Sequence, residues 1–450
     1  MRMNWQKLLD TTLLGDENRE EKPNRPNYAQ DYDRLVFSLP FRRLANKTQV
    51  HPLYAHDHVH HRLIHSVETS SVGRSLGIEV GQWLEDAGHI DAGQKHLLSG
   101  VVQAACIAHD IGNPPFGHSG EAAIGAWFAG QFAGGHPFFE AIPEADRAEF
   151  EKFEGNAQGF RLITRLEMYR NAGGMRLTHA VLGAFTKYPA LARTHVAAQA
   201  REGKAAYKGL AKFGLFRSEY DLFADVAART GLIAEEEDGQ RWWRRHPLVF
   251  LVEAADDICY NILDLEDAYV AGDLTAEKIK DLMRPLFGGS NRQFSRIEEE
   301  IAYYRARAIG ASIAACVEAF KSHYDEIMEG RFSASLISRS NMAGAFARIE
   351  DTARSQIFTA PRKTRLEVTG RNILHDVLGG LLPVLLELER VDWDAARLSD
   401  YHRQLVSAVE FDLRDVVDAY TALHALGDFT SGMTDRYAVR VHEMVTGRMG

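Results

Sequence analysis

The chain has 450 residues, of which 45% are hydrophobic and 25% charged, and its formal net charge is −10. This composition excludes a mostly disordered chain, and the acidic balance does not favour tight, charge-driven wrapping of nucleic acid. No run reaches the roughly 18 apolar residues of a membrane span, and the N-terminus lacks the apolar core of a signal peptide, so no membrane partner is expected. The three cysteines form no CxxC pair, which favours a reducing, cytoplasmic location.

The chain is predicted to be all-α, because helix-length amphipathic runs recur and strand-like alternation is scarce. Residues 1–30 are polar and expected to be held loosely, and 131–153 and 191–246 are interpreted as surface excursions. No linker-like composition divides the rest, so residues 31–450 are predicted to form a single large domain with insertions. The clearest helical runs are 97–109, 121–132, 247–269, 301–320 and 371–388.

Three well-known motifs are missing from the sequence. There is no GxxxxGK[ST] and no GxGxxG, so neither a P-loop nor a dinucleotide fold is supported. The nearest approach to HExxH runs from His61 to His65 and has Arg62 where the catalytic glutamate would stand, which excludes a zincin protease. The helix that Arg62 and His65 open is either a metal-binding segment or a solvated basic cap.

Adjacent His109 and Asp110 end an apolar helical run, and a Gly/Pro-rich turn then presents His118, with Glu121 three residues on. Imidazole nitrogen and carboxylate oxygen at one helix end can both reach a divalent metal ion. Residues three apart on a helix are neighbours, so His118 and Glu121 can share a face. The alternative is a buried histidine, a helix-terminal aspartate and a proline-rich stop, as in most isolated His-Asp pairs.

The run from 247 to 267 places Asp256, Tyr260 and Asp264 on one stripe of a predicted helix. A solvated surface helix gives the same polarity split. However, the polar side of this helix is rich in acids and has no Lys or Arg, and such acids repel one another unless a cation relieves them. A metal site is therefore predicted from side chains of three separate helices, namely His65, His109, Asp110 and Asp256.

These residues, in this order, resemble the HD superfamily of metal-dependent phosphohydrolases, and within it most closely the deoxynucleoside triphosphate triphosphohydrolase (dGTPase) branch. The resemblance implies an HD-type helical fold with its core motifs in 41–267 and a helical C-terminal part in 270–450. The matching stretches are 41–44, 47–50, 62–66, 109–121, 153–158, 187–189, 253–258, 265–267 and 431–435.

The resemblance also implies a role for each matching residue. The metal ligands fall on His65, His109, Asp110 and Asp256, with a one-residue ambiguity between Asp256 and Asp257. The catalytic histidine and its acidic partner fall on His118 and Glu121. The substrate contacts fall on Gln49 for the sugar 3′-hydroxyl, Arg62 and Lys187 for the phosphates, Tyr260 and Asp264 for the sugar, and Asn156 and Tyr188 for the pocket wall.

The reaction implied is hydrolysis of a deoxynucleoside triphosphate to the deoxynucleoside and inorganic triphosphate, with a divalent metal ion as cofactor (Mn or Mg first, then Fe, Co or Zn). Asn113 occupies a position at which many relatives of broad dNTP specificity have a second histidine. An asparagine at this position resembles the enzymes that prefer dGTP. A homo-oligomer built on dimers, up to a hexamer, and a single-stranded DNA effector are also implied.

Two other readings remain open at this point. The same metal site could serve a nucleotidase or a phosphodiesterase acting on another nucleotide, and the product released would tell these apart. A non-catalytic nucleotide or single-stranded DNA binder could instead use the run from Arg241 to Arg245 (RWWRR) as an aromatic and basic platform.

Overall fold

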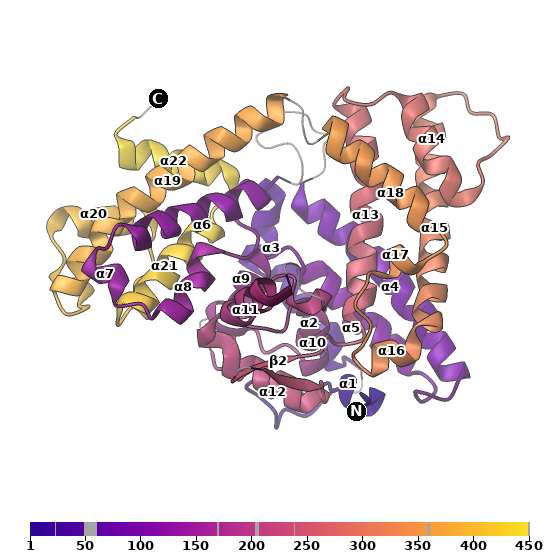
Figure 1. The fold of residues 1–450 in the computed structure, drawn as a ribbon, viewed down its shortest axis with the longest axis horizontal. Helices are drawn as coiled ribbons and strands as arrows, with labels where there is room; N and C mark the ends of the chain where they lie inside the picture. Colours follow the sequence, from indigo (N-terminus) through magenta and orange to yellow (C-terminus); the bar gives the residue numbers. More distant parts are fainter. Residues whose placement is uncertain are drawn as a thin grey trace.

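The computed structural model describes residues 1–22, 24–48, 61–168, 171–202, 207–237, 239–357 and 361–448. Helices dominate these residues (Figure 1), and the only sheet among them is the antiparallel hairpin of β1 (Ala234–Glu237) and β2 (Gln240–Trp243). The predicted all-α class is confirmed. Within the same ranges, no helix combines the length and the apolar character that crossing a membrane requires.

The helices of the first half are α1 (Trp5–Leu8), α2 (Asn27–Phe37), α3 (Leu39–Arg43), η1 (Leu44–Asn46), α4 (Arg62–Asp86), α5 (Gln94–Ala108), α6 (Gly117–Ala133), α7 (Pro137–Glu140), α8 (Glu144–Glu151), α9 (Gly155–Arg161), η2 (Leu162–Leu166), α10 (His179–Phe185), α11 (Ala192–Glu202), η4 (Lys208–Leu210), η5 (Arg217–Glu219) and α12 (Tyr220–Thr230).

The helices of the second half are α13 (Val249–Val270), α14 (Ala276–Phe287), α15 (Ile297–Ser322), α16 (Tyr324–Met328), α17 (Leu336–Arg339), α18 (Ala343–Thr352), η6 (Ala353–Ile357), α19 (Pro361–Arg390), η7 (Ala395–Arg397), α20 (Asp400–Val409), α21 (Ala419–Gly432) and α22 (Asp435–Thr446). All five helical runs predicted from the sequence fall on these helices, namely on α5, α6, α13, α15 and α19.

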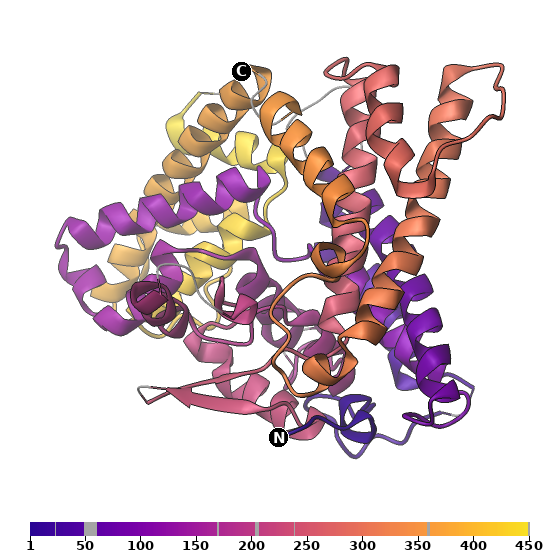
Figure 2. The ribbon, with the colours of Figure 1, turned by 45° about the vertical axis from the view of Figure 1, so that its right-hand side comes forward.

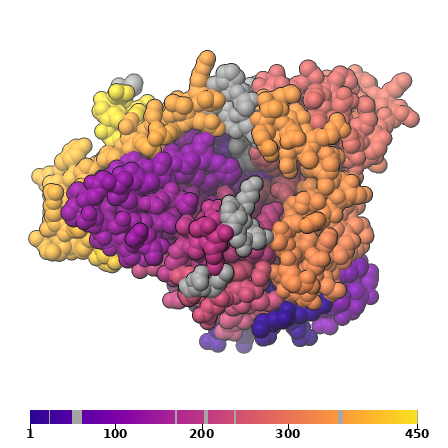
Figure 3. All heavy atoms as spheres, viewed as in Figure 1, coloured from indigo at the N-terminus to yellow at the C-terminus, as the bar shows by residue number. Residues whose placement is uncertain are grey.

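Two large hydrophobic cores organise these helices. The first core lies among α4, α5, α10, α13 and α15, and the second lies among α6, α8, α19, α21 and α22. Figures 1 and 2 show the second group on one side of the molecule and the first group on the other. The space-filling view in Figure 3 shows the same division at the surface, with α6 in purple on one side and α16 to α18 in orange on the other.

A row of glycines lets α4 and α5 pack closely in the first core. Gly73, Gly77 and Gly81 recur every fourth residue, so they lie on one face of α4. A Cβ atom at these positions would come within 2.4 Å of Cys106 Sγ, 2.7 Å of Ser99 Cα and 2.8 Å of the Lys95 Cα, respectively. The start of α4 and the end of α5, where the predicted ligands lie, are held together by this close backbone approach.

The interpretation of 131–153 and 191–246 as surface excursions is wrong. Both stretches fold back and bury aromatic side chains in the two cores, which offsets the ordering of their irregular backbone. The buried aromatic residues of these stretches include Phe138, Phe139, Phe150, Phe213, Phe216 and Phe223.

Residues 1–14 are also packed, against the expectation that residues 1–30 are held loosely, whereas residues 15–22 and 24–25 are mostly exposed. Trp5, Leu8 and Leu14 are buried in the first core. The indole N–H of Trp5 donates to the Tyr324 hydroxyl at 2.9 Å. A few apolar residues inside a polar sequence are therefore enough to anchor this segment.

Candidate active site

Three helices of the first core each bring one potential metal ligand to the same point. His65 lies in the first turn of α4, His109 caps the end of α5, and Asp256 lies in the middle of α13. The Asp256 Oδ1 atom is 3.1 Å from His65 Nε2 and 3.4 Å from His109 Nε2. One ligand atom from each of the three residues lies within 4.8 Å of the other two.

The imidazole of His109 is oriented toward this point. Its Nδ1 atom is 2.8 Å from the Cys106 carbonyl oxygen. Because a carbonyl only accepts, Nδ1 carries a proton, and Nε2 is the ring nitrogen that can offer a lone pair to a metal ion when it is deprotonated. His109 Nε2 is buried and makes no hydrogen bond within the described residues. A buried imidazole nitrogen beside a second imidazole and a carboxylate fits a divalent metal ion, and a hydrogen bond from the other ring nitrogen to a carbonyl is typical of such ligands.

Asp110 lies beside this group rather than inside it. Its Oδ1 atom is 3.5 Å from His109 Nε2, but the carboxylate also accepts hydrogen bonds from Arg62 Nη1 at 2.6 Å and from Asn113 Nδ2 at 2.5 Å. The structure therefore brings His65, His109 and Asp256 together most tightly, with Asp110 at the edge of the cluster.

Of the adjacent Asp256 and Asp257, only Asp256 belongs to the group of side chains that could hold a metal ion, so the geometry favours Asp256. Burial, together with the charges of Glu253 and Asp256, raises the pKa of Asp257 to about 8. Asp257 therefore faces other acids, whereas Asp256 faces the two imidazoles.

Fixed cations balance the carboxylates of the cluster. Burial alone would raise the pKa of Asp256, but Lys187, whose Nζ donates to Asp256 Oδ2 at 2.8 Å, and His109 hold it well below its usual range. Burial alone would also raise the pKa of Asp110, and the charges of Arg62 and His109 outweigh it. Both carboxylates are thus kept ionised, which is the state that binds a metal ion.

His118 and Glu121 form a second pair, at the start of α6. The side chain of His118 is 82% exposed, and its Nδ1 atom is 2.8 Å from Glu121 Oε2. Burial alone would raise the pKa of Glu121, but its hydrogen bond and charge interaction with His118 lower it. An ionised Glu121 accepts a hydrogen bond from the Nδ1–H group of His118. Because the side chain of His118 is largely exposed, its Nε2 atom remains available for proton exchange.

Glu121 is itself fixed by the start of α9. The Gly155 N–H donates to Glu121 Oε1 at 2.8 Å. A Cβ atom at Gly155 would lie 2.4 Å from Asn113 Oδ1 and 2.7 Å from Glu121 Oε1. A side chain at 155 would displace both of these oxygen atoms, so this close contact links the pair of His118 and Glu121 to Asn113, which donates to Asp110.

The substrate residues implied by the resemblance are placed as follows. Lys187 and Arg62 donate to the two cluster carboxylates, and Tyr260 lies one helical turn after Asp256 on α13. Burial raises the pKa of Tyr260, as does the charge of Asp264 one turn further on. Asn156 donates to Glu154 Oε1 at 2.6 Å. Burial raises the pKa of Tyr188, whereas the charge of the neighbouring Lys187 lowers it. Gln49 lies outside the described residues.

The acids of α13 are neutralised by distant parts of the chain, which the sequence did not indicate. Glu253 lies 3.0 Å from Lys208 Nζ and 3.3 Å from Arg245 Nη2, and Glu266 pairs with Arg305 at 2.5 Å. The helix therefore carries fewer uncompensated acids than its own composition suggests, and the case for a metal ion depends on Asp256 and the histidines.

The run from Arg241 to Arg245 is not an exposed platform. Trp242 and Trp243 are only 5% and 4% exposed, and Arg245 is 1% exposed. Stacking of bases needs open aromatic faces, so the interpretation of this run as a nucleic-acid platform is wrong.

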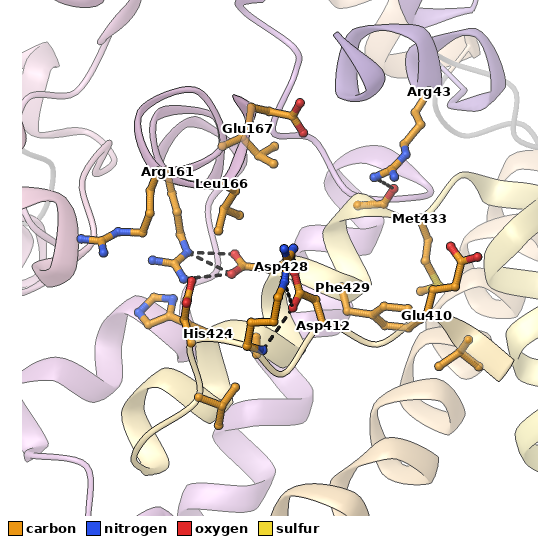
Figure 4. Close-up of a pocket in the computed structure, with 18 of the residues that line it drawn as sticks. Arg43, Arg161, Leu166, Glu167, Glu410, Asp412, His424, Asp428, Phe429 and Met433 are labelled. Carbon is orange, nitrogen blue, oxygen red and sulfur yellow. Dashed lines mark hydrogen bonds and ion pairs between the residues drawn. The ribbon is translucent and has the colours of Figure 1, made fainter. Parts of the chain in front are cut away.

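A separate cavity of about 860 Å³ lies between η2 and the C-terminal helices α20 to α22. Figure 4 shows its wall, where Arg161 is bonded to Asp428. Arg161 also donates to Glu219 at 2.8 Å, so the guanidinium at the cavity wall is hydrogen-bonded to two carboxylates. None of the residues of the metal cluster or of the pair His118 and Glu121 lines this cavity.

The HD domain family matches residues 62–189, the stretch that holds His65, His109, His118 and Lys187. A deoxyguanosinetriphosphate triphosphohydrolase-like protein of Synechocystis is 37% identical over 447 residues, covering 99% of both chains. One of the same description from Pseudomonas aeruginosa is 37% identical over 457 residues, again covering 99% of both chains. A deoxyguanosinetriphosphate triphosphohydrolase of Serratia proteamaculans is 28% identical, covering 94% of both chains. The resemblance predicted from the sequence is confirmed, and the chain belongs to the HD-domain family of deoxyguanosinetriphosphate triphosphohydrolases and their like.

Proposed function

We propose that this chain hydrolyses deoxynucleoside triphosphates to the deoxynucleoside and inorganic triphosphate, with dGTP as the preferred substrate. The proposal depends on one observation. The Nε2 atom of His109, at the end of α5, is buried, makes no hydrogen bond to the described part of the chain, and lies beside His65 of α4 and Asp256 of α13. The family membership of the chain supports the choice of substrate.

Four residues would hold a divalent ion at this point, namely His65, His109, Asp110 and Asp256. Such an ion supplies Lewis acidity toward a phosphate oxygen and makes a water molecule easier to deprotonate. A mixed set of imidazole and carboxylate ligands suits Mn²⁺ better than Mg²⁺, which prefers oxygen ligands alone. We therefore propose Mn²⁺ as the working ion, with Mg²⁺, Fe²⁺, Co²⁺ and Zn²⁺ as alternatives to be compared.

His118 is the proposed general acid. The bond that breaks joins the α-phosphorus to the 5′-oxygen, and the oxygen of water becomes bonded to that phosphorus. The leaving 5′-oxygen needs a proton, and His118 Nε2 can supply it, because Nδ1 is 2.8 Å from Glu121 Oε2 and Nε2 is left as the ring nitrogen that can reach the substrate. Water entering the reaction provides the replacement proton.

Arg62 and Lys187 are the proposed phosphate ligands. Arg62 contacts Asp110 on one side, and on the other a Cβ atom at Gly117 would come within 2.7 Å of Arg62 Nη2. The guanidinium thus lies between the metal cluster and the residue that precedes His118. A triphosphate in this place would meet fixed positive charge without any rearrangement of the backbone, which is how phosphoryl-transfer sites act.

The remaining parts of the proposal follow the family resemblance. Gln49 and Asp264 would bind the sugar, Tyr260 would crowd the 2′ position, and Asn156 and Tyr188 would line the pocket. The side-chain amide of Asn113 donates to Asp110. Asn113 would therefore influence base choice indirectly, by fixing the turn between α5 and α6. Assembly into dimers or hexamers and an effect of single-stranded DNA are tested by light scattering and by assays with added oligonucleotide.

The deciding experiment is product analysis with the Mn²⁺-loaded protein, each of the four dNTPs and the matching ribonucleotides, in water labelled with ¹⁸O. We expect deoxynucleoside and triphosphate, with the label in the triphosphate and the fastest turnover with dGTP. Release of orthophosphate or pyrophosphate would assign the site to a nucleotidase or a phosphodiesterase instead.

A further inference from the structure

One carboxylate at the start of α22 contacts two segments that are far away in the sequence. Asp435 Oδ1 accepts a hydrogen bond from the Phe116 N–H at 3.1 Å. Asp435 Oδ2 accepts from the Thr48 N–H at 3.2 Å and from the Thr48 hydroxyl at 2.5 Å. Asp435 is 2% exposed, so these bonds are shielded from water.

A buried lysine makes a parallel connection among the same three parts of the chain. Lys47 Nζ donates to the carbonyl oxygens of Asn113 and Ser431, both at 2.7 Å. Lys47 is 3% exposed. Lys47 thus binds the turn before α6 and the end of α21, and its neighbour Thr48 binds the start of α22.

Both of the segments that Asp435 holds lead directly to proposed active-site residues. The Thr48 backbone pairs with that of His61, the residue before Arg62. Phe116 lies two residues before His118. A displacement of either segment would therefore move a substrate contact relative to the proposed acid.

Phe116 has a backbone conformation that needs such support. Its φ of +63° lies in the left-handed region, which non-glycine residues rarely adopt. Its ring packs so closely on α19 that a Cβ atom at Gly370 would be 2.7 Å from the Phe116 Cγ. A conformation of this kind persists only where the surroundings determine it, here through the Asp435 bond on one side and α19 on the other.

We propose that Asp435 is a positioning residue for the reaction, fixing the segment that ends at Thr48 and the turn that ends at His118 in register with each other. The inference rests on the proposed function, since it concerns the rate of that reaction. The C-terminal helices would then contribute to turnover without touching the substrate.

The test compares Asp435→Asn with Tyr437→Phe. An asparagine at 435 presents one acceptor oxygen in place of two, so at least one of the two segments loses its bond. Tyr437→Phe removes a hydrogen bond of the same helix, from the Tyr437 hydroxyl to the Val409 carbonyl at 2.9 Å, that stays within the C-terminal part. We expect kcat for dGTP, per bound Mn²⁺, to fall about 10- to 100-fold in Asp435→Asn and to stay at the parental value in Tyr437→Phe.

A second pair of variants separates positioning from folding. Thr48→Ser keeps the hydroxyl group that donates a hydrogen bond to Asp435. The valine of Thr48→Val has nearly the same shape as threonine but lacks this hydroxyl group. We expect Thr48→Ser to retain the parental kcat and Thr48→Val to lose it in part, with equal Mn²⁺ content and similar melting temperatures. This pair decides the question if Asp435→Asn does not fold.

The positioning role would be overturned if Asp435→Asn had the same kcat per bound Mn²⁺ as Tyr437→Phe. It would also be overturned if Thr48→Val had the same kcat per bound Mn²⁺ as Thr48→Ser. The parental protein is assayed first for triphosphate release. If it releases none, the proposed function fails on its own, and this failure is distinct from a loss confined to the Asp435 and Thr48 variants.

Discussion

The metal cluster and the turn that leads to His118 are built in opposite ways. His65 and Asp256 lie within long helices of the first core, and His109 caps the end of another, where helical packing and the glycine row of α4 fix the backbone. His118 follows an irregular turn with a left-handed Phe116 and stands 82% exposed at the start of a helix of the second core.

The difference shows which task each region suits. A metal ion needs ligands held at fixed spacing, which buried helices and the hydrogen bonds between their side chains provide. A proton donor must reach an oxygen that leaves, so its imidazole has to be accessible, and hydrogen bonds from remote segments supply the order that an exposed turn lacks. The predictions below ask whether the two regions can be damaged separately.

The largest effect is expected from removing a ligand. His109→Ala deletes the Nε2 lone pair, so the protein should lose its Mn²⁺ and its triphosphate release should fall by at least ~10³-fold, because a bound ion contributes several kcal/mol to such reactions. Metal analysis and product chromatography measure the two losses. His195→Ala is the control, since His195 is also buried and its Nδ1 also bonds a carbonyl, that of Leu210. A His109→Ala protein that still binds one Mn²⁺ would refute the ligand assignment.

Removing the exposed imidazole should damage only the second region. His118→Ala is expected to lower kcat by about 10²- to 10⁴-fold, the range typical of general acid catalysis, while Mn²⁺ binding remains parental. Steady-state kinetics with dGTP and metal titration check this split. Parental turnover in His118→Ala would show that another group protonates the leaving oxygen.

A single methyl group should disturb the contact between the two regions. Gly155→Ala places a Cβ atom 2.4 Å from Asn113 Oδ1 and 2.7 Å from Glu121 Oε1, so both side chains must move. We expect kcat to fall about 10- to 100-fold with the metal retained. Gly130→Ala on α6 is the matched control, because a Cβ atom there has no neighbour within 4 Å, and unchanged kinetics in both variants would contradict the tight fit described at Gly155.

The smallest effect concerns stability in a part of the first core remote from the chemistry. Burial raises the pKa of Asp31 to about 7. The folded protein then binds more protons than the unfolded chain between about pH 4 and 7, so the free energy of unfolding should fall as pH rises through this window, by a few kcal/mol. In Asp31→Asn this slope should be smaller, whereas Asp33→Asn, whose side chain is 43% exposed, should keep it. Chemical denaturation at several pH values measures the slopes, and an identical slope in all three proteins would exclude Asp31 as its source.

The first region was largely predictable from the sequence, whereas only the long helices α6 and α19 of the second core were. Amphipathic periodicity identified α5 and α13, and the adjacent His109 and Asp110 marked the helix end that carries a ligand. The second core includes short helices such as α7 and α8, of 4 and 8 residues, which are too short for periodicity to reveal. Their buried phenylalanines therefore resembled a surface excursion.

Long-range pairing explains what else was missed at the site. The composition of α13 could not predict that Lys208 and Arg245 would neutralise Glu253. Lys208 lies in the short helix η4, and Arg245 follows the hairpin of β1 and β2. Likewise, Lys47 and Ser431 are 384 residues apart, and their hydrogen bond is decided only by the tertiary fold. Residue type and local spacing indicate which side chains carry chemistry, but not which charges and backbone groups hold them in place.

The central claim is that a single divalent ion binds between α4, α5 and α13, and diffraction from crystals grown with Mn²⁺ tests it most directly. The account predicts one anomalous peak at about 2.0–2.3 Å from the Nε2 atoms of His65 and His109 and from a carboxylate oxygen of Asp256. No peak at this point, with His109 Nε2 still without a partner in the presence of saturating Mn²⁺, would contradict it.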